Sequence, residues 1–330
     1  MLNDKTILIT GGTGSFGKKF IKTALNKYPK VKKIIVYSRD EFKQFEMANM
    51  PEFKPFEKQL RFFIGDVRDK ERMMRAFDGV DIAIHAAALK QVPACEYNPF
   101  EAIKTNIHGA QNVIECAIDK GVKKVVALST DKACAPVNLY GATKLCSDKL
   151  FIAGNSYAGF KETRFSVVRY GNVAGSRGSV IPFFQKLVAD GATELPITDT
   201  NMTRFWLKLE QAVEMVLETI EHMRGGELYV KKIPSMKILD LATAIAPQLK
   251  IKVIGIRPGE KIYEQMITKE DAFHTIEFKD FYIVLPQIGL AGIKYDYPNA
   301  KRVAPNFEYH SGNNDKWLSI EDMRKLISEI

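Results

Sequence analysis

Residues 6–20 read TILITGGTGSFGKKF, an apolar run that ends in a glycine-rich turn and continues into an amphipathic stretch. Gly11, Gly14 and Gly17 have G-x-x-G-x-x-G spacing, which permits a tight turn and lets backbone N–H groups approach a pyrophosphate. Alone, such a triple is a weak signal, but between a strand and a helix it predicts a dinucleotide site at the positive end of the helix. The expected contacts are Gly11, Thr13, Gly14, Ser15, Phe16 and Gly17.

Beyond this turn, the first half of the chain alternates short apolar runs with amphipathic stretches of helix length. The runs read KKIIVYS, LRFFIGD, VDIAIHAAA, KKVVALS and RFSVVRYGNV. Strands that are apolar nearly throughout are buried on both faces, which indicates a parallel sheet with helices on either side. We therefore predict an α/β fold with a doubly wound parallel sheet, the Rossmann architecture, and expect residues 1–174 to form the dinucleotide-binding domain.

From residue 175 onward the regular alternation ends. Three stretches, PFFQKLVADG, LEQAVEMVLETIEH and SMKILDLATAIAPQL, are typical of helices, the third beginning after Ser235. Turn-rich pieces such as LPITDT and IRPGEK separate them. We expect residues 175–330 to form a smaller mixed lobe inserted among the last strands of the sheet. The polar stretch FEYHSGNNDKW is expected to be a surface loop.

The composition limits the class of protein. A chain of 330 residues with a 46% hydrophobic fraction is typical of a soluble globular protein. The net charge of +9 favours anionic ligands, but the chain lacks zinc-finger spacing, RNP-type aromatic motifs and dense basic blocks. Phosphorylated small molecules are therefore favoured over nucleic acid. No metal site is predicted.

The sequence also bears on the cellular compartment of the protein. None of the four cysteines forms a C-x-x-C pair, which favours buried free thiols in a reducing cytosol. The charged opening MLNDKTILIT is unlike a signal peptide. No apolar run is as long as the roughly 18–20 residues that a membrane span needs. We expect a cytoplasmic protein with no membrane partner.

The end of the second apolar run, YSRDEFK, bears on the choice of cofactor. NAD sites place a carboxylate there for the ribose hydroxyls, whereas a 2′-phosphate needs cations and hydroxyls. Ser38 and Arg39 come first, with Lys43 one helical turn on, and the planar fork of arginine suits phosphate. The alternatives are a surface Arg39 paired with Asp40 or Glu41, and an NAD site built on Asp40. The pattern predicts NADP.

Two further strand ends complete the predicted cofactor edge. Asp66 and Val67 follow the third run, at a position suited to the adenine. In HAAALK, after the fourth run, Ala86 leaves room for the cofactor to lie close to the backbone. Lys90 is either an ordinary exposed lysine or a ligand of a cofactor or substrate phosphate. His85 lies inside an apolar run and is expected to be structural.

The stretch LSTDKACAPVNLYGATK gathers an acid, an amine and a phenol. Asp131 and Lys132 are either a surface pair, worth roughly 0–1 kcal/mol, or an acid–base pair around one substrate. Tyr140 and Lys144 lie one helical turn apart, so the ammonium favours a phenolate. The spacing before Tyr140 favours the catalytic interpretation.

The glycine turn, Asp66-Val67, HAAA and Tyr140-x-x-x-Lys144 together resemble the extended short-chain dehydrogenase/reductase family. More narrowly, GGTGSFGK, VYSRDEFKQ, FIGDVRD, HAAALKQVP, STDKACAPVNLYGATK, RYGNVAGSRGSVIPFF, MTRFW, IPSMK and RPGEK resemble the inverting UDP-N-acetylglucosamine 4,6-dehydratases of pseudaminic acid biosynthesis. The resemblance covers nearly the whole chain and is weakest at residues 50–60 and after residue 270. Retaining sugar dehydratases carry Thr-Asp-Glu where this chain has Thr-Asp-Lys.

The resemblance implies a mechanism with a tightly bound NADP that is regenerated in each turnover. Tyr140, supported by Lys144, takes the proton of the sugar 4-hydroxyl. Lys132 removes the proton from carbon 5, provided that burial and the nicotinamide cation lower its pKa. Asp131 protonates the departing 6-hydroxyl, which requires a raised pKa, and Thr130 hydrogen-bonds the 4-oxygen. Tyr140, Lys144 and Val173 are added to the cofactor contacts.

For the substrate, the resemblance implies a nucleotide-sugar site with arginines that converge on the diphosphate. Glu260 is expected to bind the ribose by resemblance only. The implied contacts are Lys90, Asn172, Arg177, Gly178, Ser179, Val180, Ile181, Arg204, Arg257 and Glu260. Relatives assemble through helices that flank the sheet, so a homo-oligomer is expected.

Two alternatives remain open. A UDP-sugar 4-epimerase, or a dehydratase that also epimerises carbon 3, uses the same Tyr140 and Lys144, but a simple epimerase does not need Asp131 and Lys132. A catalytically silent Rossmann protein that senses NADP belongs to another class. That alternative predicts damaged motifs, and both motifs are intact in this sequence.

Overall fold

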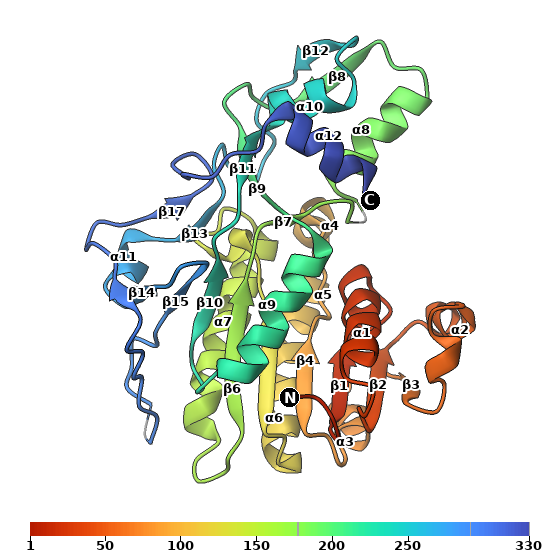
Figure 1. Ribbon diagram of the computed structural model, residues 1–330, viewed down its shortest axis with the longest axis vertical. Helices are drawn as coiled ribbons and strands as arrows, with labels where there is room; N and C mark the ends of the chain where they lie inside the picture. Colours follow the sequence, from red (N-terminus) through yellow and green to blue (C-terminus); the bar gives the residue numbers. More distant parts are fainter. Residues whose placement is uncertain (177, 291, 330) are drawn as a thin grey trace.

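The computed structural model describes residues 1–176, 178–290 and 292–329 (Figure 1). Within them, a ten-stranded sheet has the order β16-β14-β15-β10-β6-β5-β4-β1-β2-β3. Seven strands are parallel: β10 (Leu228–Lys231), β6 (Arg164–Arg169), β5 (Lys124–Leu128), β4 (Ile82–His85), β1 (Thr6–Thr10), β2 (Lys33–Ser38) and β3 (Leu60–Ile64). The antiparallel edge consists of β15 (Phe281–Val284), β14 (Thr275–Glu277) and β16 (Lys301–Arg302).

Helices cover both faces of the sheet because successive strand residues point to opposite sides. Leu8 packs in one core, while Ile7 and Ile9 pack in the other. The first face carries α3 (Lys70–Ala76), α6 (Gly109–Lys120) and α7 (Leu139–Tyr157). The second carries α1 (Ser15–Lys27), α2 (Glu41–Asn49) and α9 (Leu209–His222). The predicted doubly wound Rossmann sheet is confirmed.

A second lobe follows directly from β6, at the carboxyl ends of the parallel strands (upper part of Figure 1). It contains the sheet β11-β9-β7, the pair β12-β8 and three helices around a core that includes the fully buried Trp206. Its elements are β7 (Asn172–Val173), α8 (Val180–Ala189), β8 (Glu194–Ile197), β9 (Thr203–Leu207), β11 (Ser235–Lys237), α10 (Ile238–Ile245), β12 (Lys250–Val253) and α12 (Ile320–Ser328). The third predicted helix thus begins later than expected, because residues 235–237 pair with β9.

The remaining elements of the main sheet domain and the second lobe are short. They are the 3-10 turns η1 (Lys54–Phe56) and η3 (Asp131–Ala133), α4 (Val92–Tyr97), α5 (Pro99–Ile103), the π-helical segment η2 (Lys104–His108), β13 (Gln265–Ile267), α11 (Lys269–Ala272) and β17 (Tyr309–His310). Cys95, Cys116 and Cys134 are buried, and all four cysteines are free thiols, as predicted. No helix in the described part of the chain is long and apolar enough to cross a membrane.

The prediction of a surface loop for FEYHSGNNDKW is wrong. Tyr309 and Ser311 are buried, and β17 pairs with β13. The Ser311 Oγ lies 2.7 Å from the Thr203 Oγ1, and the Asn314 Nδ2 donates to the Ile233 carbonyl at 2.7 Å. Polar side chains are readily buried when hydrogen bonds satisfy them, and those partners are far away in sequence.

Candidate active site

The glycine-rich turn has the geometry that an anion-binding loop requires. Gly11 has φ +67°, and a Cβ there would lie 2.9 Å from the Ala87 nitrogen. A Cβ on Gly17 would overlap the Gly12 carbonyl oxygen. α1 begins at Ser15 with Gly14 as its N-cap and no capping side chain, which leaves its first N–H groups for a ligand. The turn therefore fits a pyrophosphate.

At the end of β2, Asp40 and Arg39 are the two charged residues that bear on the cofactor, and they have different partners. The Asp40 carboxylate accepts from the Lys43 backbone nitrogen at 3.0 Å and pairs with its Nζ at 2.6 Å. These contacts with Lys43 lower the pKa of Asp40. The Arg39 side chain is instead 60% exposed, and its guanidinium lies 3.9 Å from Asp66. Asp40 is therefore held by its own helix, and Arg39 does not pair with it.

Three other predicted cofactor residues lie at neighbouring strand ends. The Ser38 hydroxyl accepts from the Gln44 amide at 2.9 Å, so its own hydrogen remains for another acceptor. Burial opposes ionisation of Asp66, but its hydrogen bonds with Arg68 outweigh this and lower its pKa. Val67 is buried. The structure thus brings Ser38 and Asp66 to one edge of the sheet.

His85 is buried in a structural role, as expected from its apolar run. Its Nδ1 lies 2.9 Å from the Thr10 Oγ1, and its ring lies 5.5 Å from that of Phe151. Burial, assisted by the nearby charge of Lys144, lowers the pKa of His85 to about 3. The imidazole is therefore neutral. The Thr10 hydroxyl also accepts from the backbone nitrogen of Ala86 at 3.2 Å, which positions the predicted cofactor-facing loop.

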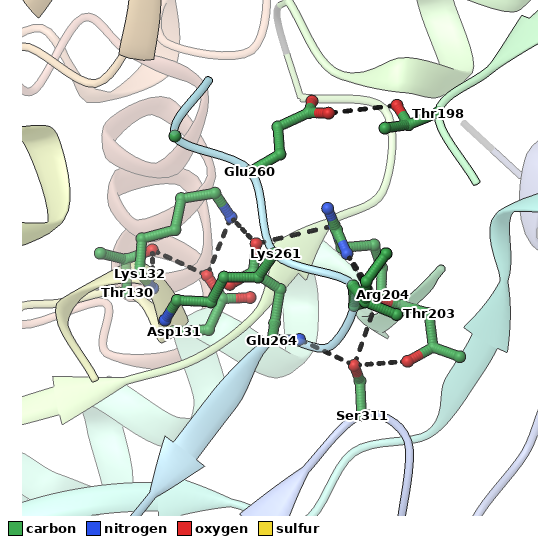
Figure 2. A network of polar contacts seen from close by, with 12 residues as sticks. Thr130, Asp131, Lys132, Thr198, Thr203, Arg204, Glu260, Lys261, Glu264 and Ser311 are labelled. Atoms are coloured by element: carbon green, nitrogen blue, oxygen red, sulfur yellow. Dashed lines mark hydrogen bonds and ion pairs between the residues drawn. The ribbon is translucent and has the colours of Figure 1, made fainter. Parts of the chain in front are cut away.

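Asp131 and Lys132 form the centre of a buried ionic cluster (Figure 2). They lie in η3, which Thr130 caps by accepting from the Lys132 backbone nitrogen. The Lys132 Nζ lies 3.0 Å from the Asp131 Oδ1 and 3.0 Å from the Glu264 Oε1. Asp131 and Glu264 are only 1% and 2% exposed. The alternative of a pair on a surface turn is therefore wrong.

Glu264 is a member of the ionic cluster that sequence reasoning missed. Its Oε1 lies 3.6 Å from the Arg204 Nε, and its backbone nitrogen donates to the Ser311 Oγ at 3.0 Å. It directly precedes the short strand β13. A carboxylate before a brief apolar run is the available sequence signal, and that pattern is also common at protein surfaces.

The cluster sets the protonation of both predicted acid–base residues. Burial raises the pKa of Asp131, although Lys132 opposes it. Burial alone would lower the pKa of Lys132, but the carboxylates of Asp131 and Glu264 outweigh it, and the pKa is raised. The expected lowering of the Lys132 pKa is therefore wrong, because a second carboxylate flanks the ammonium.

α7 carries the Tyr-x-x-x-Lys pair and is fastened to the second lobe. Its N-cap, Asn138, accepts from the Gly141 nitrogen at 2.8 Å and donates to the Gly259 carbonyl at 2.8 Å. One turn of this helix separates Tyr140 from Lys144, and Lys144 is buried. The helix therefore holds Tyr140 beside the cluster, whereas Lys144 lies near Asp148 and His85.

The pKa of Tyr140 does not follow the expectation of a phenolate. Burial raises the pKa of Tyr140 to about 12, and the charge of Lys132 is the strongest opposing effect, followed by the Thr130 hydroxyl. Burial also lowers the pKa of Lys144, against the charge of Asp148. The cation that most favours the phenolate is thus Lys132, because it lies in the same cluster.

On the substrate side, two buried polar atoms point to a ligand. Among the described residues, the Asn172 Oδ1 and the Ser179 Oγ have no hydrogen-bond partner. Ser179 is the N-cap of α8, which begins with Val180 and Ile181. Gly178, with φ +72°, completes this turn. Unpaired buried acceptors and hydroxyls are costly unless a ligand satisfies them.

Two of the arginines expected at a diphosphate lie beside different carboxylates. Arg204 is buried and donates to the Thr203 carbonyl at 2.7 Å, beside Glu264. The Arg257 Nε instead donates to Glu260 at 2.9 Å, and Glu260 accepts from the Thr198 hydroxyl at 3.1 Å, apart from the cluster (Figure 2). Arg177 lies outside the described residues. The diphosphate site stays a prediction.

Lys90 is exposed, but it senses the charge of the ionic cluster. Partial desolvation lowers its pKa, and the charge of Lys132 adds to the effect. An anionic group bound there would stabilise the charge of Lys90. The role of Lys90 as a phosphate ligand stays a prediction.

The doubly wound sheet, the glycine turn and the Tyr-x-x-x-Lys helix define an extended short-chain dehydrogenase/reductase. The chain belongs to the family of polysaccharide biosynthesis proteins, which matches residues 7–286. A UDP-N-acetylglucosamine 4,6-dehydratase (inverting) from Campylobacter jejuni is 57% identical over 335 residues, which cover 99% of this chain and 98% of that protein. A UDP-glucose 4-epimerase from Rickettsia canadensis is 43% identical, covering 99% of this chain and 96% of that protein.

Solved structures give the same fold. The X-ray structure of Pen from Bacillus thuringiensis superposes with a TM-score of 0.90 at 39% identity, covering 100% of this chain and 98% of that chain. The dTDP-glucose 4,6-dehydratase DesIV from Streptomyces venezuelae has a TM-score of 0.68 at 24% identity, covering 78% and 86% of the two chains. The second likeness concerns the fold alone.

Proposed function

We propose that this chain is a UDP-N-acetylglucosamine 4,6-dehydratase that inverts carbon 5 of the sugar, a hydro-lyase. The product is UDP-2-acetamido-2,6-dideoxy-β-L-arabino-hex-4-ulose. The observation that carries the proposal is the ion pair of the buried Asp131 with the partly buried Lys132, beside Tyr140. The 57% identity to the inverting dehydratase of Campylobacter jejuni, over nearly the full length of both chains, supports it.

The cofactor is a nicotinamide dinucleotide, with NADP as the finer proposal. The glycine turn fits its pyrophosphate, and the small residue Ala86 leaves space beside the strand ends. The exposed Arg39 supports NADP, since Asp40 is engaged by Lys43. When bound, the cofactor supplies reversible hydride transfer, with sugar carbon 4 as donor and carbon 6 as acceptor.

The residues of this chain supply the proton transfers. Tyr140 takes the proton of the 4-hydroxyl while Thr130 hydrogen-bonds the same oxygen. The resulting ketone acidifies the hydrogen on carbon 5, and Lys132 removes it in its amine form. Asp131, whose pKa is raised, protonates the 6-hydroxyl, which leaves as water. Such acid–base steps typically contribute about 10²–10⁴-fold each.

Reprotonation of carbon 5 from the opposite face gives the inverted configuration. Asn172 and Ser179 are proposed to bind the nucleotide-sugar, because their buried polar atoms lack partners within the described ranges. Lys90 and Arg257 are proposed to bind its phosphates, and Glu260 its ribose. Assembly into a homo-oligomer and a place in pseudaminic acid biosynthesis stay predictions.

A UDP-sugar 4-epimerase is the second candidate. The Rickettsia canadensis relative, 43% identical over nearly the full length, carries that name. An epimerase needs Tyr140 and Lys144 but no acid–base pair. Shielding the charges of Asp131 and Lys132 from water costs several kcal/mol in desolvation. A simple epimerase would gain no catalytic benefit from this cost. The dehydratase is therefore favoured.

The test is incubation of the purified protein with UDP-N-acetylglucosamine in D₂O, followed by NMR. A 6-deoxy-4-keto sugar with deuterium at carbon 5 and L-arabino configuration is expected. The D-xylo product alone would contradict inversion, and UDP-N-acetylgalactosamine without deuterium would identify an epimerase. Tyr140→Phe should abolish turnover, whereas Tyr157→Phe, on an exposed side chain of the same helix, should not.

A further inference from the structure

The ionic cluster contains one carboxylate more than the proposed chemistry uses. Lys132 lies between Asp131 and Glu264, with 3.0 Å from its Nζ to the nearer oxygen of each. The second oxygens of both carboxylates, Asp131 Oδ2 and Glu264 Oε2, are buried without a hydrogen-bond partner among the described residues. Asp131 already has a role as the acid. Glu264 therefore requires its own explanation.

The proposed base has the wrong protonation state in the resting cluster. Two buried carboxylates stabilise the ammonium form of Lys132, and an ammonium has no lone pair with which to take a proton from carbon 5. Lys132 must first lose a proton to a group within hydrogen-bond reach. Asp131, at 3.0 Å and with a raised pKa, can take this proton and then pass it to the leaving hydroxyl. Glu264, the other carboxylate at 3.0 Å, is held ionised by the cations around it.

We propose that Glu264 is a positioning residue that holds Lys132 against Asp131, so that the ammonium proton passes to Asp131 before proton abstraction from carbon 5. One N–H bond of Lys132 breaks and one O–H bond forms on Asp131, which leaves a neutral amine beside a carboxylic acid. The amine then takes the proton of carbon 5, and the transfer needs no other reactant. This inference rests on the proposed function.

Charged groups on every neighbouring element face this pair and bear on the transfer. Asp131 and Arg204 influence the pKa of Lys132. Lys261 and Glu264 influence the pKa of each other. The charge of Lys132 influences the pKa of Lys90 and of Tyr140. The cations hold Glu264 ionised, since Lys132 and Arg204 lower its pKa despite its burial. The resting cluster is thus an ion pair with an acceptor already in place.

The C-terminal segment sets the position of the Glu264 carboxylate. The Glu264 backbone nitrogen donates to the Ser311 Oγ at 3.0 Å, and the Ser311 nitrogen donates to the Glu264 carbonyl at 2.8 Å. Ser311 is itself anchored to Thr203, next to Arg204. The segment that was expected to be a surface loop therefore fixes the distance between Glu264 and Lys132.

The experiment compares Glu264→Gln, Glu264→Asp and Glu308→Gln with the wild type, each purified with its bound cofactor. Glu308 is a matched control, because it contacts Gln265 and Lys269 near the same strand but lies outside the cluster. Turnover of UDP-N-acetylglucosamine is measured by NMR from about pH 6 to pH 10, and cofactor reduction is followed by absorbance.

We expect Glu264→Gln to lose about 10²-fold in kcat near neutral pH while still reducing its cofactor on mixing with substrate. Its pH–rate profile should shift to lower pH, because one carboxylate fewer stabilises the ammonium form of Lys132. Glu264→Asp should keep the pH profile of the wild type at a lower rate, since it retains a carboxylate. Glu308→Gln should match the wild type.

Two results would overturn the inference alone. The first is a Glu264→Gln enzyme with the wild-type rate and pH profile. The second is a loss that is equal in Glu264→Asp while the pH profile of Glu264→Gln stays unshifted, which would indicate a structural role. If the wild type forms no 6-deoxy-4-keto sugar, the proposed function fails, and the inference fails with it.

Discussion

The glycine turn and the ionic cluster are built in different ways. The turn is one continuous segment, residues 11–17, and its geometry depends on the backbone and on missing side chains. The cluster is assembled from four distant segments, represented by Lys132, Arg204, Glu264 and Ser311, and depends on side-chain charge in a buried place. The turn is thus continuous in sequence, although Gly11 packs against Ala87, while Lys132 and Glu264 are far apart in sequence.

This difference explains why the two regions respond differently to change. In the turn, steric fit decides, so adding one methyl group should weaken ligand binding without altering any proton transfer. In the cluster, each charge sets the protonation of the others, so one substitution changes the chemistry of several residues. Substitutions in the two regions should therefore separate binding from catalysis.

Lys132→Ala should have the largest effect, because it removes the proposed base from the cluster. We expect dehydration to fall by about 10²–10⁴-fold, with cofactor affinity within about threefold of the wild type. NMR turnover and cofactor titration measure the two quantities. Lys123→Ala, in an exposed pair with Glu162, is the control and should retain activity. Retained dehydration in Lys132→Ala would contradict the proposed role of Lys132 as base, and retained epimerisation without dehydration would favour the epimerase.

Arg39→Ala should have the second-largest effect, and it should change cofactor binding only. Losing a charge-assisted contact of about 1.5–3 kcal/mol should weaken NADP about 10–100-fold and leave NAD nearly unchanged. Calorimetric titration with both dinucleotides measures the ratio. Lys30→Ala, on an exposed cation elsewhere, should bind both as the wild type does. An equal loss for both dinucleotides would contradict the 2′-phosphate assignment.

Gly17→Ala should weaken both dinucleotides, because its Cβ would overlap the Gly12 carbonyl oxygen. Overpacking of this kind costs about 1–3 kcal/mol, which corresponds to about 5–100-fold in the dissociation constant. Gly289→Ala is the control, since a Cβ there meets no atom within 4 Å. Wild-type affinity in Gly17→Ala would refute the proposed pyrophosphate turn.

His85→Gln should have the smallest effect and changes the pH dependence of stability. Burial, with the charge of Lys144, places the folded pKa of His85 at about 3, below its ordinary value of 6.5. The unfolded chain therefore takes up the proton first, and stability is lost as the pH falls below about 6.5.

This histidine should cost the wild type about 2 kcal/mol of unfolding free energy between pH 7 and pH 5. Urea unfolding at both pH values should show a smaller loss in His85→Gln. The exposed His108 offers the control, because His108→Gln should keep the wild-type difference. Equal pH dependence in all three proteins would mean that His85 is not the group responsible.

Much of this protein can be predicted from contiguous patterns. The alternation of apolar runs and amphipathic stretches predicted the doubly wound sheet, because a buried parallel strand must be apolar on both faces. The glycine spacing predicted the turn at Gly11, and LSTDKACAPVNLYGATK predicted that Asp131, Lys132 and Tyr140 lie together. These features depend on neighbours within one strand, turn or helix.

Contacts between distant segments escaped that reasoning. Glu264 lies more than a hundred residues from Lys132, and its charge reverses the expected direction of the Lys132 pKa. Arg204 faces this carboxylate rather than a diphosphate, and Ser311 is buried within a polar stretch that resembles a loop. The physical reason is that the energy of a buried charge depends on which charges the fold places around it, and residue type alone does not carry that information.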